Sequence, residues 1–105
     1  MSTDRELLER AAKAAGMKLE QGYGQPPEKC LFYMDREGRC HDWNPIDDDG
    51  DALRLAVKLK LEIGWEPNED TVWCEMAGET FDGDPYAATR RAIVRAAAEI
   101  GKGKA

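Results

Sequence analysis

The chain has 105 residues, of which 42% are hydrophobic and 34% are charged, and its formal net charge is −6 at pH 7. This composition is typical of one globular domain over residues 1–105 and excludes a wholly disordered chain. No apolar run approaches the roughly 18–20 residues that a bilayer span needs, so no membrane partner is expected. Because an acidic chain is repelled by phosphate backbones, general nucleic-acid binding is not expected either.

The cysteines and the chain start indicate the compartment. Cys30, Cys40 and Cys74 are odd in number and widely spaced, which is not typical of a disulfide framework and favours a reducing compartment. The residues after Met1 are polar at once, unlike a secretory signal. We therefore expect a cytoplasmic protein.

The first predicted element is an amphipathic helix over about residues 4–15. Thr3 is a favourable N-cap, and Glu6 three residues later completes a capping box. Gly16 follows the last apolar position and is expected to end the helix in a left-handed conformation.

A short strand over 17–20 and a loop over 21–28 are expected next, followed by a hairpin. The hairpin has strands over 30–34 and 39–43, joined by residues 35–38, which have the length and the glycine of a turn. Asn44-Pro45 should end the second strand, because proline cannot donate to a sheet ladder.

A second helix is predicted over about residues 48–60. The run of Asp47, Asp48, Asp49 and Asp51 supplies a cap and complements the positive end of the helix dipole. The apolar arc of this helix is wide and its polar strip is narrow, so we expect other elements to cover most of its sides.

The remaining elements are a second hairpin, with strands over 61–66 and 71–76, a loop over 77–83, and a last helix. Asp84-Pro85 begins this helix as N-cap and first helical residue, and Gly101 is expected to end it after Ile100. The order helix, hairpin, helix, hairpin, helix predicts an α+β fold. We expect a three-layer α/β/α sandwich with three helices on a mostly antiparallel sheet of about four strands.

The sequence predicts neither a metal nor a cofactor. His41 and the three cysteines could supply four zinc ligands, but no Cys-x-x-Cys pair is present, and the hairpin register would place Cys30 and Cys40 on opposite sheet faces. When Gly50 is aligned with the invariant glycine of a calcium loop, Pro45 and Ala56 take positions that must be acidic. The acidic run is therefore interpreted as helix capping.

No catalytic site is predicted. His41 is the one side chain that titrates near neutral pH, and no nucleophile elbow or glycine-rich phosphate loop is present. A small domain without a cofactor needs some such constellation, so we do not expect an enzyme.

Arg90 lies in the apolar arc of the last helix, between Tyr86 and Ile93. Its guanidinium must reach the edge, pair with a carboxylate, for which Asp84 and Asp51 are candidates, or bind an anion. Trp43 and Tyr86 lie at helix entrances and could be core plugs or docking aromatics. The candidate binding surface comprises Trp43, Asn44, Asp51, Asp84, Tyr86 and Arg90.

Two segments carry a family resemblance: Trp43-Asn44-Pro45 with the stretch 51–59, and the stretch 84–96. Together they resemble small phage and prophage proteins of the phage ABA-sandwich domain family. The resemblance covers roughly the whole chain and is weakest over 21–42. It implies an α/β/α sandwich and a phage or prophage gene, and it carries no catalytic or binding residues to this chain.

Three functions stay open at this point. The first is a non-enzymatic accessory protein that binds a host or phage protein, or a small anionic ligand. The second is an acidic mimic that occupies a nucleic-acid-binding site on a host protein. The net charge of −6 and the run from Asp47 to Asp51 favour it. The third is a minor hydrolase or metal-dependent enzyme that uses His41 and nearby acidic residues. The oligomeric state also stays open, because an exposed edge strand, or Trp65 and Trp73, could support a dimer.

Overall fold

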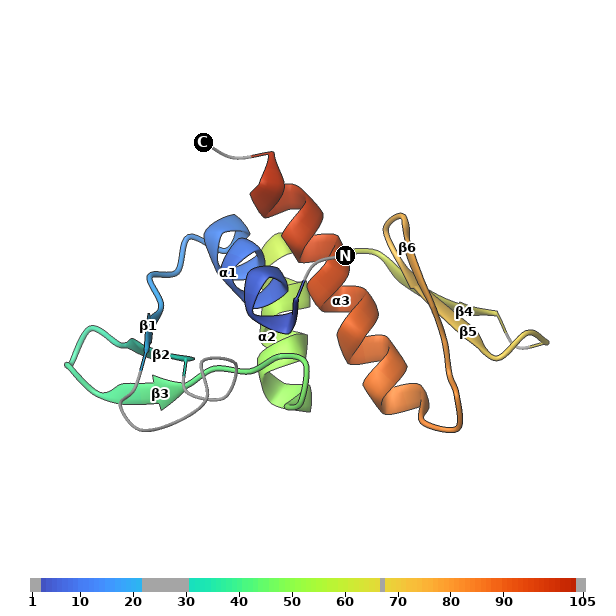
Figure 1. Ribbon diagram of the computed structural model, residues 1–105, viewed down its shortest axis with the longest axis horizontal. Coiled ribbons are helices and arrows are strands. Elements are labelled where there is room, and N and C mark those ends of the chain that lie inside the picture. The colour runs from blue at the N-terminus through green and yellow to red at the C-terminus, as the bar shows by residue number, and fades with distance from the viewer. Residues whose placement is uncertain (1–2, 22–30, 67, 104–105) are drawn as a thin grey trace.

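The computed structural model describes residues 3–21, 31–66 and 68–103 and shows an α+β fold with three helices and two small antiparallel sheets (Figure 1). Most of the expected loop over 21–28, together with Cys30, lies outside the described residues. The elements in chain order are α1 (Asp4–Ala14), β1 (Glu20–Gln21), β2 (Leu31–Met34), β3 (Cys40–Asp42), α2 (Asp49–Leu59), β4 (Ile63–Glu66), β5 (Thr71–Cys74), β6 (Ala77–Thr80) and α3 (Pro85–Lys102).

The caps that the sequence predicts are confirmed at the start of each helix. The Thr3 hydroxyl accepts a hydrogen bond from the Glu6 amide at 3.1 Å. Asp48 accepts from the Asp51 amide at 2.8 Å, and Asp84 accepts from the Ala87 amide at 3.1 Å. Each cap satisfies an amide that has no partner within the helix, and this fixes where the helix begins.

The expectation that Gly101 ends the last helix is wrong, because α3 continues to Lys102. Gly101 is buried where α3 crosses α1. A Cβ atom at this position would lie 1.8 Å from the Arg10 carbonyl oxygen. The glycine therefore serves a close helix–helix approach instead of a left-handed cap.

The sheets differ from the single four-stranded sheet that the sequence predicts. One sheet has the order β1-β2-β3 and the other β4-β5-β6, and all neighbours are antiparallel. The expected hairpins are present, but residues 77–80 form a further strand where a loop was predicted. A tight turn at Glu75 and Met76 makes this strand possible, with Glu75 at φ +53° and Cys74 paired with Ala77. Turns of this kind usually carry Asn or Gly, so the sequence did not indicate it.

The helices lie in the middle of the molecule, with one sheet at each end (Figure 1). Helix α3 contacts α1, α2, β5 and β6. The core consists largely of small and aliphatic side chains from these elements and includes Leu8, Val72, Ala92 and Val94. The expected three-layer sandwich is therefore not confirmed.

No helix among the described residues has both the length and the apolar character to cross a membrane. Helix α3 is the longest, and it carries Arg90, Arg91 and Arg95 in its middle.

We predict that Gly101→Ala lowers the free energy of unfolding by about 1–3 kcal/mol, because the new methyl group meets backbone that cannot move aside. Urea denaturation followed by circular dichroism measures this loss. Gly103→Ala is the matched control. Its Cβ would make an ordinary 3.6 Å contact with the Ile100 carbonyl oxygen, and we expect a change within about 0.5 kcal/mol. Equal losses in the two variants would contradict a packing role for Gly101.

Candidate functional site

The corner between β3 and α2 holds three of the six predicted binding residues, and their roles there are structural. Trp43 is 5% exposed and belongs to the core, so it is a plug and not a docking aromatic. The Asn44 side-chain oxygen accepts hydrogen bonds from the amides of Ile46 and Asp47 at 3.1 and 3.3 Å. This turn redirects the chain from the strand into the helix.

Asp51 joins this corner to α2. Its carboxylate accepts from the Asn44 amide at 3.0 Å and from the Arg54 guanidinium at 2.7 Å. The same hydrogen bond raises the pKa of Arg54 above its ordinary value. With 7% of its surface exposed, Asp51 is a buried polar residue whose hydrogen bonds are made within the corner.

Arg90 forms an ion pair within the protein, which was one of the three predicted outcomes, but its partner is neither Asp84 nor Asp51. Its Nε donates to the Ile46 carbonyl oxygen at 2.7 Å, and its Nη1 donates to Asp49 Oδ1 at 2.6 Å. The expected partners are engaged elsewhere, Asp84 as a cap and Asp51 at the corner. The Arg90 side chain is 17% exposed and ties α3 to the start of α2.

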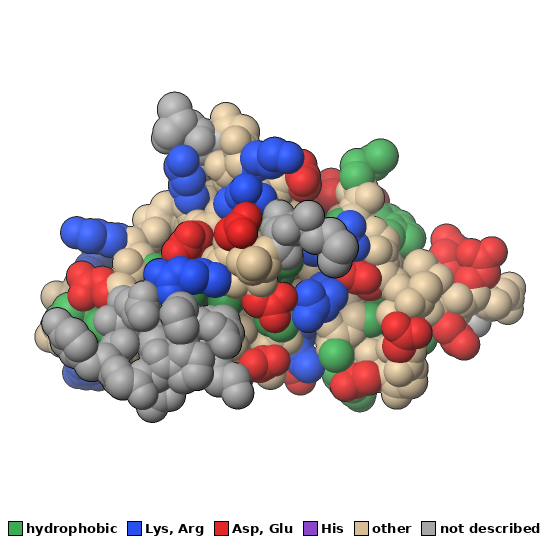
Figure 2. All heavy atoms as spheres, in the orientation of Figure 1, with side chains coloured by type: hydrophobic (Ala, Val, Ile, Leu, Met, Phe, Trp, Pro, Cys, Tyr) green, Lys and Arg blue, Asp and Glu red, His purple; other side chains and the backbone are tan. Residues whose placement is uncertain are grey.

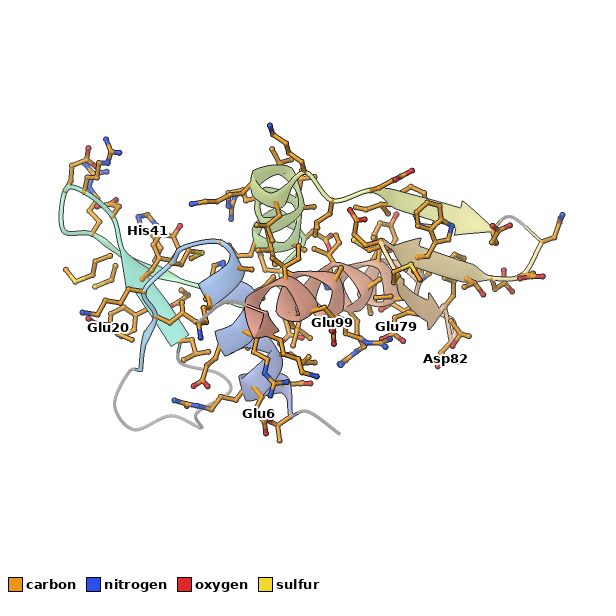
Figure 3. The ribbon with its side chains drawn as sticks, turned by 90° about the horizontal axis from the view of Figure 1, so that it is seen from above. Glu6, Glu20, His41, Glu79, Asp82 and Glu99 are labelled. Atoms are coloured by element: carbon orange, nitrogen blue, oxygen red, sulfur yellow. The ribbon has the colours of Figure 1, made fainter. Side chains whose placement is uncertain are left out.

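A groove of about 530 Å³ lies beside the Arg90–Asp49 ion pair, and its lining residues come from α2, β4 and α3. In Figure 3, α2 and β4 lie on the same side of α3. We call this hollow the α2–β4 groove. Three of its large apolar side chains are more than half exposed: Leu53 (62%), Trp65 (54%) and Tyr86 (70%). Its lining residues are Asp49, Ala52, Leu53, Ile63, Trp65, Pro85, Tyr86, Thr89, Arg90 and Ile93.

Of the six predicted site residues, the α2–β4 groove brings together only Tyr86 and Arg90. Sequence reasoning missed Leu53 because it expected α2 to be covered on most sides. That expectation is wrong, since Leu53 and Val57 are both more than 60% exposed. The available signal was the wide apolar arc of α2. An arc wider than one packing partner can cover indicates an uncovered face as readily as a fully buried helix.

Charge is distributed unevenly along the chain. Residues 61–89, which run from the end of the α2–β4 connection into α3, contain eight acidic residues and no Lys or Arg, whereas the rest of the chain has 15 basic and 13 acidic residues. We call 61–89 the acidic segment. On the face drawn in Figure 2, the charged side chains at the end formed by β4, β5 and β6 are acidic, while charged side chains of both signs lie over the helices. The acidic residues are Glu62, Glu66, Glu69, Asp70, Glu75, Glu79, Asp82 and Asp84.

A second groove, of about 920 Å³, lies among α1, α3 and the β5–β6 turn. It is larger, but charged side chains that already pair within the protein line it. Arg95 contacts Glu79 at 3.1 Å and the Gly78 carbonyl oxygen at 2.9 Å, and Arg91 contacts Asp4 at 3.4 Å. We therefore take the more apolar α2–β4 groove as the candidate site.

His41 lies on β3, at the opposite end of the molecule from Glu79 and Asp82 (Figure 3). Its Nε2 is 2.8 Å from Asp35 Oδ2, and its ring stacks on Tyr33 with centroids 5.1 Å apart. The His41 hydrogen bond, with backbone hydrogen bonds from Arg39 and Glu37, lowers the pKa of Asp35. Among the described residues, no group of three or more His, Cys, Asp or Glu is placed to hold a metal.

The two described cysteines are unpaired and differ in environment. Cys40 is exposed on β3, whereas Cys74 is fully buried on β5. Burial raises the pKa of the Cys74 thiol from its ordinary 9.0 to about 11. Such a thiol acts as a small core side chain and not as a nucleophile.

No protein-family model, curated protein or solved structure matches this chain. The resemblance to the phage ABA-sandwich family therefore stays a prediction that rests on the segments 43–45, 51–59 and 84–96.

We predict that Arg90→Met lowers the free energy of unfolding by about 2 kcal/mol, because it removes a charged donor and leaves the Ile46 carbonyl without that partner. Asp49→Asn is the control. It keeps the Arg90–Ile46 bond, and Asp49 is 67% exposed, so its loss should stay below about 1 kcal/mol. Urea denaturation at neutral pH measures both variants. A larger loss for Asp49→Asn would show that the ion pair, not the carbonyl bond, holds the helices.

We predict that Cys74 reacts with Ellman's reagent at pH 8 at least about 100-fold more slowly than an unperturbed thiol, since a pKa two units higher leaves a hundredth of the thiolate. A Cys30→Ser/Cys40→Ser variant isolates Cys74, and a Cys30→Ser/Cys74→Ala variant isolates Cys40 as the exposed control. Full reaction of Cys74 should appear only in denaturant. Equal rates for the two native thiols would contradict the burial of β5.

Proposed function

We propose that this chain is a non-enzymatic accessory protein that binds a partner protein through the α2–β4 groove. The observation that carries the proposal is the convergence of Leu53, Trp65 and Tyr86, each more than half exposed, on one apolar hollow. A contiguous exposed apolar patch on a soluble protein marks an interaction site, and large aromatic side chains contribute most of the binding energy in protein interfaces.

A protein partner is favoured over a small anionic ligand because Arg90 is engaged. Its Nε and Nη1 already bond Ile46 and Asp49, so an anion would have to displace an existing ion pair. The proposal keeps the phage or prophage origin and the host cytoplasm that the sequence suggests. The partner is accordingly a host or phage protein.

An acidic mimic of nucleic acid is the second candidate, and the acidic segment supports it. Eight acidic residues without a Lys or Arg over 61–89 give one part of the chain a strong negative potential. A mimic would act through charge, so its binding would tolerate loss of the groove's apolar side chains and would weaken when acids such as Glu62 and Glu66 are neutralised.

The test compares tagged full-length variants as baits in lysate from phage-infected bacteria. We expect Leu53→Ser/Tyr86→Ser to retain at least about tenfold less of a specific partner than wild type, because the substitutions remove apolar contacts at the centre of the interface. Quantitative mass spectrometry of the retained proteins measures the difference. The thermal melting temperature of each bait checks that it is folded.

Val57→Ser/Met76→Ser is the matched control, since these side chains are 67% and 99% exposed but do not line the α2–β4 groove. It should retain the same partner as wild type. Equal retention by the groove variant, or no protein retained above an untagged control, would contradict the proposal.

A further inference from the structure

We infer that the segment bound in the α2–β4 groove is a basic amphipathic helix of the partner protein, with apolar side chains in the hollow and Lys or Arg facing the acidic segment. This inference rests on the proposed function and names the chemistry of the partner. It combines two observations that are independent of each other: the apolar lining and volume of the groove, and the excess of acidic residues in the segment that contributes its sheet wall.

The groove presents hydrocarbon surface to aliphatic side chains of a partner. The Trp65 indole nitrogen donates to the Thr89 hydroxyl at 3.3 Å, and that hydroxyl donates to the Pro85 carbonyl oxygen at 2.7 Å. The polar atom of the indole is therefore satisfied within the protein, and the exposed part of the side chain is hydrocarbon. Leu53 lies on the opposite wall, on α2, so apolar contacts are available from both sides.

The walls and the volume of the hollow suit the clustered side chains of a helix. The walls come from α2, α3 and β4, and the volume of about 530 Å³ has room for several side chains. A helix presents a cluster of side chains at positions i, i+3, i+4 and i+7, whereas a strand spaces the side chains on one face about 6.6 Å apart in a row. We therefore choose a helix as the occupant, because the hollow has room for such a cluster.

The charge at the groove sets the sign of the partner. Asp49 and Arg90, the two ions in the lining, pair with each other at 2.6 Å and so offer little net charge. Beyond them, the sheet side and the entrance to α3 belong to the acidic segment, in which Glu62, Glu66 and Asp84 are exposed. Long-range attraction therefore favours a cationic partner and disfavours nucleic acid or a second copy of this chain, whose net charge is −6.

The test uses two synthetic 14-residue helical peptides with Leu at the same i, i+3, i+4 and i+7 positions. One has Lys at its polar positions and the other has Glu. Fluorescence anisotropy of the labelled peptides measures binding to the full chain at 50 and 300 mM NaCl. We expect the Lys peptide to bind at least about tenfold more tightly than the Glu peptide, and the difference to shrink at the higher salt concentration.

Substitutions locate the binding site. Leu53→Ser/Tyr86→Ser should weaken binding of the Lys peptide by about tenfold, and Val57→Ser/Met76→Ser should not change it. Glu62→Gln/Glu66→Gln should weaken it by about threefold. These two acids alternate in sequence with Ile63 and Trp65, which line the groove, so they lie on the other face of the strand and act on the partner through long-range attraction. Glu20→Gln/Glu37→Gln removes the same number of charges in the region of the other sheet and is the matched control, with no change expected.

The outcomes separate this inference from the proposed function. Equal affinity for the two peptides, with loss in Leu53→Ser/Tyr86→Ser, would keep the groove as a docking site and overturn the basic partner. Binding of the Lys peptide that ignores the groove substitutions would overturn both. Dimerisation of the chain in analytical ultracentrifugation that the same groove substitutions abolish would show that a second copy occupies the groove, and it would also overturn the inference.

Discussion

The geometry of the candidate site depends on the side chain of Arg90, which extends from α3 to the start of α2. One guanidinium bonds the carbonyl of Ile46 just before α2 and the carboxylate of Asp49 in its first turn. The carbonyl bond is the better shielded of the two, because the Asp49 side chain is largely exposed and water screens its charge. With α2 held in this way, its outer face is directed past α3 toward β4, and a hollow lies between them.

The small size of the sheets explains why that hollow is left uncovered. Each sheet has three short strands, and α3 is the element against which β5, β6, α1 and α2 all pack. A 105-residue chain has little apolar surface to spare, so its core is compact and rich in alanine. Three large apolar side chains lie outside this core: Leu53, Trp65 and Tyr86. Apolar side chains of this size at the surface favour binding over an accidental exposure.

Charge is distributed unevenly along the chain, so one side of this surface is acidic. The acidic segment spans β4, β5, β6 and the start of α3, and the arginines that follow it on α3 pair with acids from α1, α2 and β6. Arg95, for example, bonds Glu79 and the Gly78 carbonyl and so holds the edge strand β6 against α3. One residue of the acidic segment, Glu79, is thus paired within the fold. The exposed remainder would attract the cationic partner that we propose.

The sequence by itself determined the local structure. Thr3, Asp48 and Asp84 predicted all three helix starts, and the two hairpins followed from alternation and turn residues, because caps and turns depend on neighbours within a few positions. Only the tertiary structure decided that the strands form two sheets, that Gly101 serves a helix crossing, and that Asp49 pairs with Arg90. It also decided that Trp43 is buried while Leu53 is exposed. These outcomes depend on contacts between residues far apart in the chain, and neither hydrophobicity nor periodicity specifies which partner covers a given face.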